Sequence, residues 1–444
     1  MNKEFHKKQN FFSFSDIDSE RKDRIMKFTS TEATPAPHVP PGVLRLTGAA
    51  KEDIPMYRIQ TMNKISPVGL NRFPSELYEV GDAVQDPQGI LVRSAKLLDL
   101  EFNPSLLAIA RAGVGVNNIP LDRCAAAGIP VFSTPGANAN AVKELVICAM
   151  LMGSRDIPGA IRWVREQAAS GVDVSTVVEK GKSAFIGPEL YKKTLGIIGL
   201  GAIGSIVANT AISLGMDVYG YDPFLSVDTA LRLGRHVHVV KDINDLYKRS
   251  DYITMHIHYT EKTAHMIDAD AIAAMKRGVR VINLARGEIV DDEAMLTALD
   301  TGMVAAYITA FPNNRLLTAP HVIAMPHLGA STPESEQNCA AMAVDTLRDY
   351  LESGNIRSSV NLPEMTMDRS GVQRLCVLHK NVPGMLANIT SLFGRDGVNV
   401  ENLSNKSRGD YAYTMVDLGS KVGDNVIEDV RRTANVIRVR SLEW

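Results

Sequence analysis

A glycine-rich turn between an apolar run and a helical run is the feature that most constrains how this chain folds. The apolar run 195–198 leads into G-L-G-A-I-G at 199–204, and a helical pattern continues through 208–214. Gly199 allows the tight turn, Gly201 lets backbone amides approach a pyrophosphate, and Gly204 lets helix and strand pack closely. The helix N-terminus also favours phosphate charge. These residues therefore predict a dinucleotide-binding unit rather than a simple turn.

An acidic residue closes this unit. Asp222 ends the next apolar run, 218–221, and follows Gly204 by 18 positions. A carboxylate at this place accepts hydrogen bonds from both ribose hydroxyls and repels a 2′-phosphate. The sequence therefore predicts NAD as the cofactor in preference to NADP.

The rest of the pattern indicates an α/β protein with more than one domain. The chain has 444 residues, which exceeds the usual size of a single domain. Short apolar runs typical of parallel strands lie at 89–92, 106–109, 195–198, 218–221, 252–255, 279–284 and 322–324. An S-T-P-E signal at 331–334 opens a predicted helix that runs to 354. We expect a doubly wound nucleotide-binding domain up to residue 328.

The last part of the chain has a pattern of its own. A polar segment at 361–370 is expected to be a linker. Beyond it, strand, helix, strand, strand, helix and strand are predicted at 374–379, 383–395, 398–405, 411–418, 425–433 and 437–441. This order is ferredoxin-like. A small domain of this kind at the end of an enzyme suggests regulation.

Composition excludes several classes of function. The net charge is −2 with both signs interspersed, so we expect no nucleic-acid or membrane partner. No apolar run approaches the roughly 18 residues of a membrane span. Residues 1–55 contain no signal-peptide pattern and are expected to be a flexible extension, so a soluble, cytoplasmic protein is predicted.

The cysteines indicate neither disulfides nor a metal site. The four cysteines form no C-x-x-C pair, and we expect all of them to be buried, reduced thiols without a metal ion. They are Cys124, Cys148, Cys339 and Cys376.

Two further motifs carry chemistry. They are N-x-A-R-G-x-x-V-D at 283–291 and P-H-x-G-x-S-T at 326–332. Together they resemble the paired signatures of the D-2-hydroxyacid dehydrogenases, and the resemblance extends from about residue 56 to the end of the chain. It implies oxidation of a D-2-hydroxy acid, which needs a base for the hydroxyl proton and a cation for the carboxylate. His327 matches the family's acid/base, and Arg286 matches the residue that grips the carboxylate.

The resemblance also implies domains and binding residues. It places a substrate-binding domain of flavodoxin-like fold at 56–153 and 329–362, a Rossmann-type NAD-binding domain at 154–328 and a regulatory domain at 373–444. The substrate that the resemblance implies is 3-phosphoglycerate, since V-R-S-A at 92–95 resembles the family's substrate loop and its arginine and serine suit a phosphate group. The implied substrate-binding residues are Arg93, Ser94, Gly113, Val114, Gly115 and Asn117. The implied cofactor-binding residues are Gly199, Gly201, Ala202, Ile203, Gly204, Asp222, Asn138 and Ala285.

One part of the family pattern is missing. The family pairs its histidine with a glutamate in a D-V-F-x-x-E-P stretch, and this chain has Thr309 and Asn314 at the two acidic positions. Without a carboxylate partner, we expect the pKa of His327 to stay near its ordinary value. A neutral Asn314 could still orient the imidazole by hydrogen bonding. Lys143 and Arg315 are the other two candidates to compensate, and Lys143 is the tentative third catalytic residue.

The C-terminal unit resembles amino-acid-sensing ACT domains through H-K-N-V-P-G-M-L at 379–386 and G-V-N-V at 397–400. The resemblance implies that His379, Asn381 and Asn399 bind L-serine as an effector at an interface in a homodimer or homotetramer. The alternative is a domain that serves only in dimerisation. For the whole chain, the alternatives are a dehydrogenase for another D-2-hydroxy acid and a binding protein that senses NAD or an amino acid without catalysis.

Overall fold

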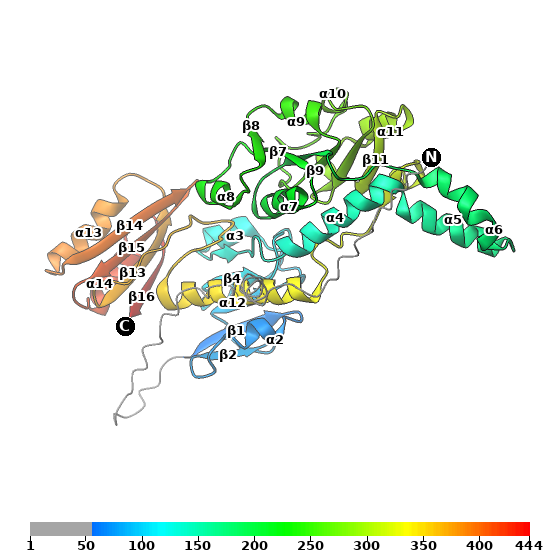
Figure 1. The fold of residues 1–444 in the computed structure, drawn as a ribbon. Coiled ribbons are helices and arrows are strands. Elements are labelled where there is room, and N and C mark those ends of the chain that lie inside the picture. Colours follow the sequence, from blue (N-terminus) through cyan, green and yellow to red (C-terminus); the bar gives the residue numbers. More distant parts are fainter. Residues whose placement is uncertain (1–55) are drawn as a thin grey trace, which may run out of the picture. The chain divides into compact units, whose positions relative to one another are not determined.

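The computed structural model describes residues 56–444 (Figure 1). The predicted flexible extension at 1–55 lies outside them. The described residues form three sheets, one for each predicted domain. The prediction of two parallel α/β domains followed by a small antiparallel domain is confirmed.

The nucleotide-binding domain contains seven parallel strands in the order β12-β11-β10-β9-β6-β7-β8. The strands are β6 (Thr194–Ile198), β7 (Asp217–Tyr221), β8 (Val237–Val240), β9 (Tyr252–Met255), β10 (Val279–Asn283), β11 (Val304–Thr309) and β12 (Val322–Ala324). The sequence pattern did not predict β8 and β11. The order reverses at β6 and β9, as in doubly wound dinucleotide-binding sheets, and ligands bind such sheets beyond the carboxyl ends of the strands.

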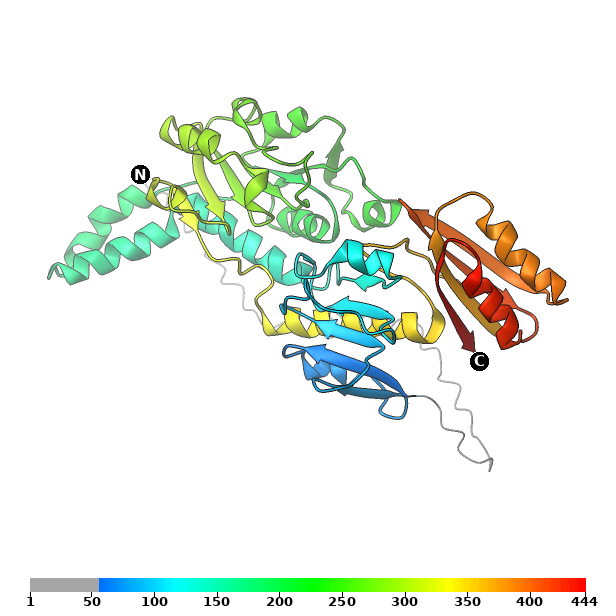
Figure 2. The same ribbon diagram turned by 180° about the vertical axis from the view of Figure 1, so that it is seen from behind.

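Helices cover both faces of this sheet (Figure 2). On one face, α7 (Ala202–Ser213) shares a buried core with β6 and β7. On the other face lie α9 (Ile243–Arg249), α10 (Ala269–Ala273) and α11 (Asp292–Asp300). Two short helical segments, α8 (Val227–Arg232) and the 3-10 turn Gly287–Ile289, follow β7 and β10.

The substrate-binding domain contains five parallel strands in the flavodoxin-like order β2-β1-β3-β4-β5. They are β1 (Tyr57–Met62), β2 (Tyr78–Gly81), β3 (Gly89–Val92), β4 (Ala108–Arg111) and β5 (Val131–Phe132). Helices α2 (Pro67–Leu70) and α3 (Leu121–Ala126) connect strands, and α12 (Pro333–Ser353) returns to this domain and packs against the sheet. Thr332 caps α12 and Gly354 ends it at φ 75°, in agreement with the predicted start and stop.

Helix α4 (Ala139–Arg155) lies at the boundary between the two domains. We predicted this segment as part of the substrate-binding domain. Its buried side chains pack instead in the core of the nucleotide-binding domain; they are Val142, Val146, Ala149 and Met150. The domain boundary therefore lies before α4 and not after it.

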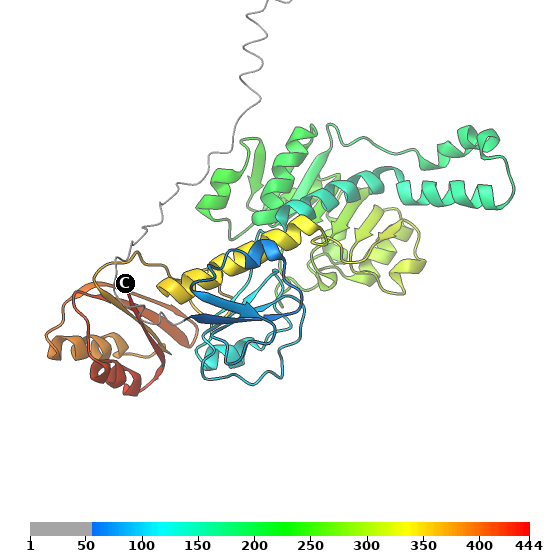
Figure 3. The ribbon, with the colours of Figure 1, turned by 90° about the horizontal axis from the view of Figure 1, so that it is seen from below.

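The nucleotide-binding domain carries a projecting pair of helices, the α5–α6 arm, that the sequence did not predict. Helices α5 (Ile157–Ala169) and α6 (Val174–Gly181) contain no buried residue. They form a hairpin that projects from the sheet (Figure 3). Apolar side chains are exposed along it, including Ile161, which is 51% exposed, and Val164.

The C-terminal domain has the predicted ferredoxin-like arrangement. It contains β13 (Gln373–Lys380), α13 (Met385–Arg395), β14 (Val400–Arg408), β15 (Tyr411–Leu418), α14 (Asp424–Arg432) and β16 (Val436–Glu443). The antiparallel sheet has the order β14-β15-β13-β16, and both helices cover one face (Figures 1 and 2).

The other face of this sheet is buried against the substrate-binding domain. Cys376, Tyr413 and Leu442 share a core with Tyr350 and Leu351 of α12. The segment predicted as a polar linker also enters this core, because Leu362, Met365 and Met367 are buried. That segment is therefore a packed connection and not a free linker.

C-terminal side chains also satisfy the last carbonyl groups of α12. Arg440 donates to the carbonyls of Tyr350 and Leu351 at 3.0 and 2.8 Å. Arg374 donates to the Ser353 carbonyl at 2.8 Å, and the Tyr413 hydroxyl donates to that of Gly354 at 2.7 Å. Helix C-termini leave four carbonyls without intrahelical partners, so these contacts tie α12 to the C-terminal domain.

The prediction about the cysteines has a structural outcome. Cys124, Cys339 and Cys376 are buried, but Cys148 is exposed, because it lies on the outer side of α4. The prediction that all four thiols are buried is therefore wrong for Cys148. Within residues 56–444, no helix is both long and apolar enough to span a membrane, and no group of three metal-ligating side chains occurs.

Candidate active site

The glycine turn has the geometry that its sequence predicts. Gly199 has φ 91°, and a Cβ added there would lie 2.7 Å from the His256 carbonyl oxygen. A Cβ on Gly204 would lie 1.9 Å from the Gly199 carbonyl oxygen, so only glycine lets α7 pack this closely. A Cβ on Gly201 would meet no atom within 4 Å. Gly201 therefore faces open space at the start of α7, where a pyrophosphate has room to approach.

Asp222 lies at the carboxyl end of β7 beside this turn. One carboxylate oxygen accepts a hydrogen bond from the Leu200 amide at 3.0 Å, and the other accepts from the Phe224 amide at 2.9 Å. These contacts fix the carboxylate next to the glycine turn. Each oxygen retains a lone pair for a further donor, such as a ribose hydroxyl.

The loop that carries Arg286 is held by a buried asparagine. Asn283 is fully buried at the end of β10; its Nδ2 donates to the Arg286 carbonyl at 2.8 Å and its Oδ1 accepts from the Ala285 amide at 3.1 Å. Its Nδ2 also lies 3.4 Å from the hydroxyl of Tyr307 on β11. The first residue of the N-x-A-R-G motif thus positions the arginine.

Several predicted residues converge on the Gly113–Gly115 loop after β4. A Cβ on Gly115 would lie 3.4 Å from Nη2 of Arg286, 3.8 Å from Nη1 of Arg111 and 3.9 Å from Oδ1 of Asn117. Gly113 has φ 157°, and a Cβ there would lie 2.7 Å from Arg111 Nη1. Glycines at this loop therefore leave room for two guanidinium groups.

Arg111 is the site residue that the sequence analysis missed. It is the last residue of β4, and its Nε donates to the Arg93 carbonyl at 3.0 Å. Burial lowers the pKa of Arg111, and the nearby positive charges of Arg93 and Arg286 lower it further. Its place at the carboxyl end of a parallel strand was the available signal, because ligands bind there.

Arg93 follows β3 at the same edge of the sheet. The side-chain oxygen of Asn63, after β1, accepts from the backbone amides of Ser94 and Ala95 at 3.2 and 2.6 Å. Nη2 of Arg93 lies 2.7 Å from Oε1 of Glu336 in the first turn of α12. The predicted phosphate-binding arginine is therefore already paired with a carboxylate.

His327 lies in the loop between β12 and α12, and its ring packs 5.0 Å from that of Phe311. Partial burial lowers its pKa, and the positive charge of Arg286 lowers it further. The pKa of His327 is therefore lowered and does not stay near its ordinary value, contrary to our expectation. Within residues 56–444, no carboxylate contributes to the shift of this pKa.

The candidate partners of His327 lie elsewhere. Thr309 is fully buried, Asn314 is exposed, and Arg315 pairs with Glu293 on α11. The Nζ of Lys143 donates to Asn140 Oδ1 at 2.7 Å. None of these contacts reaches the imidazole.

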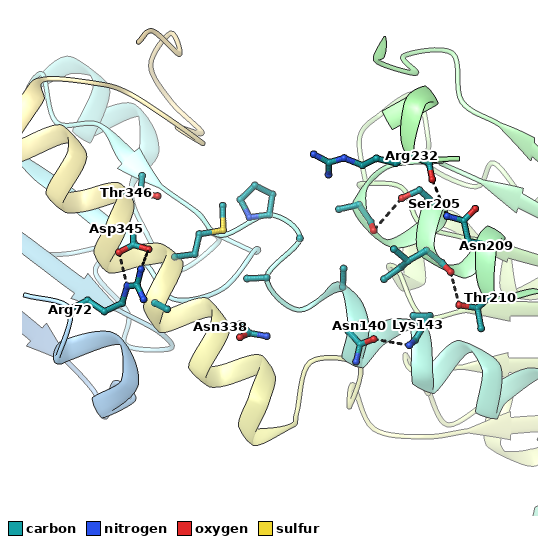
Figure 4. A pocket seen from close by; sticks show the side chains of 18 residues that line it. Arg72, Asn140, Lys143, Ser205, Asn209, Thr210, Arg232, Asn338, Asp345 and Thr346 are labelled. Carbon is teal, nitrogen blue, oxygen red and sulfur yellow. Dashed lines mark hydrogen bonds and ion pairs between the residues drawn. The ribbon is translucent and has the colours of Figure 1, made fainter. Parts of the chain in front are cut away.

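Lys143 lines a cavity of about 1060 Å³ between α4, α7 and α12, which Gly136 and Ala202 also line. Figure 4 shows its amino group turned toward Asn140 on the α7 side, opposite the Arg72–Asp345 pair. Neither Arg286 nor His327 lines this cavity. Within residues 56–444, the polar contacts of Lys143 go to Asn140 and Glu144 and not to these two motif residues.

The residues at this site fit a dinucleotide. Asn138 Oδ1 is buried without a hydrogen-bond partner within residues 56–444, at the loop before α4. Gly136 of the same loop approaches Ala202, since a Cβ on Gly136 would lie 3.2 Å from the Ala202 Cβ. An orphan acceptor beside the first turn of α7 and the open space at Gly201 suit a polar ligand that runs across the helix N-terminus.

The predicted effector residues are not equally accessible. His379 is buried, with Nδ1 2.8 Å from the Lys380 carbonyl and Nε2 2.9 Å from the Thr414 hydroxyl. Asn381 and Asn399 are exposed. A ligand can reach the two asparagines directly, whereas His379 is already hydrogen-bonded inside the domain.

Fold and site together define a nucleotide-dependent dehydrogenase architecture, and comparison with known proteins identifies the family. Residues 147–329 match the NAD-binding domain model of the D-isomer specific 2-hydroxyacid dehydrogenases. A D-3-phosphoglycerate dehydrogenase of Haemophilus influenzae is 31% identical over 82% of this chain and 88% of its own length. The chain belongs to the D-isomer specific 2-hydroxyacid dehydrogenase family.

Other relatives agree with this assignment. A D-3-phosphoglycerate dehydrogenase of Synechocystis is 36% identical over 71% of this chain. An NAD⁺-bound 3-phosphoglycerate dehydrogenase of Entamoeba histolytica aligns with a TM-score of 0.54 at 26% identity, covering 69% of this chain and 99% of that structure. The chain spans 55–60% of the length of three curated relatives, including the Synechocystis protein.

Proposed function

We propose that this protein oxidises 3-phospho-D-glycerate to 3-phosphohydroxypyruvate with NAD, the first step of L-serine biosynthesis. The observation that carries the proposal is the approach of the Arg111 and Arg286 guanidinium groups to the Gly113–Gly115 loop, with Arg93 at the end of the neighbouring strand β3, where its carbonyl accepts from Arg111. A substrate with a carboxylate at one end and a phosphate at the other matches these separate guanidinium groups. The relatives named D-3-phosphoglycerate dehydrogenase support the same substrate.

The residues divide the reaction between them. Arg286 would hold the carboxylate and the reacting oxygen through its guanidinium fork. Arg93 and Ser94 would bind the phosphate, and Asn117 would help to orient the substrate. His327 would accept the hydroxyl proton, and its lowered pKa favours the neutral base form. NAD, when bound at Gly201 and Asp222, supplies the acceptor for the hydride that leaves C2.

The direct test is NADH formation with 3-phosphoglycerate, D-glycerate and D-lactate at equal concentrations. We expect the phosphorylated substrate to give the highest kcat/KM because only it engages Arg93. Preference for D-lactate would favour a dehydrogenase for another 2-hydroxy acid. No turnover with any of the three, combined with tight NADH binding, would favour the non-catalytic binding protein.

Cofactor choice has its own test. Replacing Asp222 with Ala removes the carboxylate beside the glycine turn. We expect the preference for NAD over NADP to fall by about tenfold or more, because charge-assisted hydrogen bonds to the ribose and repulsion of the 2′-phosphate disappear together. An unchanged preference would contradict this role of Asp222.

Regulation and assembly are proposed on separate grounds. We infer that L-serine binds near Asn381 and Asn399. Titration of L-serine against activity tests this inference, and no inhibition at millimolar serine would favour a C-terminal domain that serves only in dimerisation.

We also infer that the protein forms a homodimer or homotetramer. The exposed apolar side chains of the α5–α6 arm support self-association. Light scattering tests the oligomeric state. A cytoplasmic location remains a prediction from the sequence.

A further inference from the structure

The Glu336 carboxylate contacts the predicted phosphate-binding arginine. Glu336 lies in the first turn of α12, and its Oε1 is 2.7 Å from Nη2 of Arg93. Thr332 caps this turn through the Ser335 amide at 3.1 Å, so the helix start is well fixed. The side chains of Arg93 and Glu336 are 39% and 44% exposed. Solvent therefore reaches the pair, and so can a dissolved anion.

The arginines Arg93, Arg111 and Arg286 differ in whether a carboxylate of the protein pairs with them. Within residues 56–444, Arg93 has a carboxylate within 4 Å, whereas Arg111 and Arg286 have none. A carboxylate that binds Arg286 therefore displaces no protein anion. A phosphate that binds Arg93 meets a guanidinium already occupied by Glu336.

We propose that Glu336 is a specificity-determining residue, because its carboxylate competes with the substrate's phosphate for Arg93. This inference rests on the proposed function, in which Arg93 binds the phosphate. A solvent-exposed ion pair contributes little stability, so a phosphate dianion can displace Glu336. After displacement, the Glu336 carboxylate and the substrate's phosphate both lie near Arg93, and the repulsion between these two anions weakens phosphate binding. Glu336 thereby lowers the affinity for phosphorylated hydroxy acids and leaves that for unphosphorylated ones unchanged.

The test compares Glu336→Gln with wild type by calorimetric titration of 3-phosphoglycerate and of D-glycerate, together with steady-state kinetics. We expect the variant to bind 3-phosphoglycerate about two- to fivefold more tightly, the size expected when an exposed ion pair is lost. The KM for 3-phosphoglycerate should fall by the same factor while kcat stays unchanged, and D-glycerate binding should not change.

Glu334→Gln is the matched control, because Glu334 lies in the same helical turn, is exposed and has no ion pair within residues 56–444. It removes the same charge from the helix N-terminus and should leave 3-phosphoglycerate binding unchanged. In an Arg93→Ala background, Glu336→Gln should also have no effect, since the competition requires the guanidinium.

Unchanged or weaker 3-phosphoglycerate binding by Glu336→Gln would overturn the inference, as would equal tightening by Glu334→Gln. The titration does not depend on turnover. Tighter binding by Glu336→Gln in a protein that oxidises no 3-phosphoglycerate would therefore support the inference and contradict the proposed function. Oxidation of 3-phosphoglycerate without tighter binding by Glu336→Gln would support the proposed function and contradict the inference about Glu336.

Discussion

The glycine turn and the arginine cluster are two sites of one molecule that are built in different ways. The turn and Asp222 lie within a single strand, helix and strand, and their geometry follows from local backbone requirements. The cluster joins the ends of β3 and β4, the loop after β10 and the first turn of α12. The geometry of the glycine turn depends on residue identity at fixed spacing, whereas that of the arginine cluster depends on tertiary packing.

The largest expected effect is on the stability of the C-terminal domain, which contacts the end of α12. Arg374 and Asp417 form a fully buried ion pair in the C-terminal domain, with distances of 2.5 and 2.7 Å. Replacing Asp417 with Asn should lower the free energy of unfolding by about 3–5 kcal/mol, because an unpaired guanidinium stays buried. Urea denaturation measures this loss.

The matched control is the exposed pair Arg72–Asp345, whose side chains are 48% and 46% exposed. Asp345→Asn should cost at most about 1 kcal/mol. If both variants lose the same stability, the C-terminal domain does not depend on its buried ion pair in the way that the packing indicates.

The glycine turn offers a smaller effect that separates folding from binding. Gly204→Ala should lower stability by about 1–3 kcal/mol, because its Cβ would overlap the Gly199 carbonyl and force α7 away from β6. Gly201→Ala should leave stability unchanged, since its Cβ meets open space, but should weaken NADH binding. Thermal denaturation and NADH fluorescence measure the two effects. A Gly204→Ala variant as stable as wild type would contradict the close packing.

Sequence reasoning succeeded where function depends on local patterns. The strand, turn and helix around Gly199, the start of α12 at Thr332 and the ferredoxin-like order of the last domain follow from hydrophobic periodicity and capping. The motif residues Arg286 and His327 lie at the carboxyl end of the same sheet, and the pKa of His327 depends on Arg286.

The features that sequence reasoning missed are long-range contacts. Arg111 ends an ordinary apolar strand, and only the fold places it beside Arg286. The polar segment after residue 361 gave no sign that Met365 and Met367 fill a core shared by two domains. The α5–α6 arm has amphipathic helices but buries no side chain, so periodicity did not distinguish it from core helices.

The smallest expected effect is a pH dependence of kcat/KM. In the proposed mechanism the neutral imidazole of His327 accepts the hydroxyl proton, and its lowered pKa keeps this form populated at lower pH. We therefore expect kcat/KM for oxidation to begin to fall only below the ordinary histidine pKa of about 6.5. Reduction of the keto acid needs the protonated ring and should show the opposite trend. An acidic limb centred above pH 7 would contradict the lowered pKa.

Replacing Arg286 with Gln separates action on the substrate from binding of the cofactor, which we assign to two independent groups of residues. The decisive measurement is kcat/KM for 3-phosphoglycerate in Arg286→Gln, with NADH affinity measured on the same protein. We expect kcat/KM to fall on the order of 10²–10³-fold, because a charged donor to the reacting oxygen is removed, while NADH affinity stays unchanged. Near-native kcat/KM, or an equal loss of NADH affinity, would show that Arg286 and the glycine turn do not act independently.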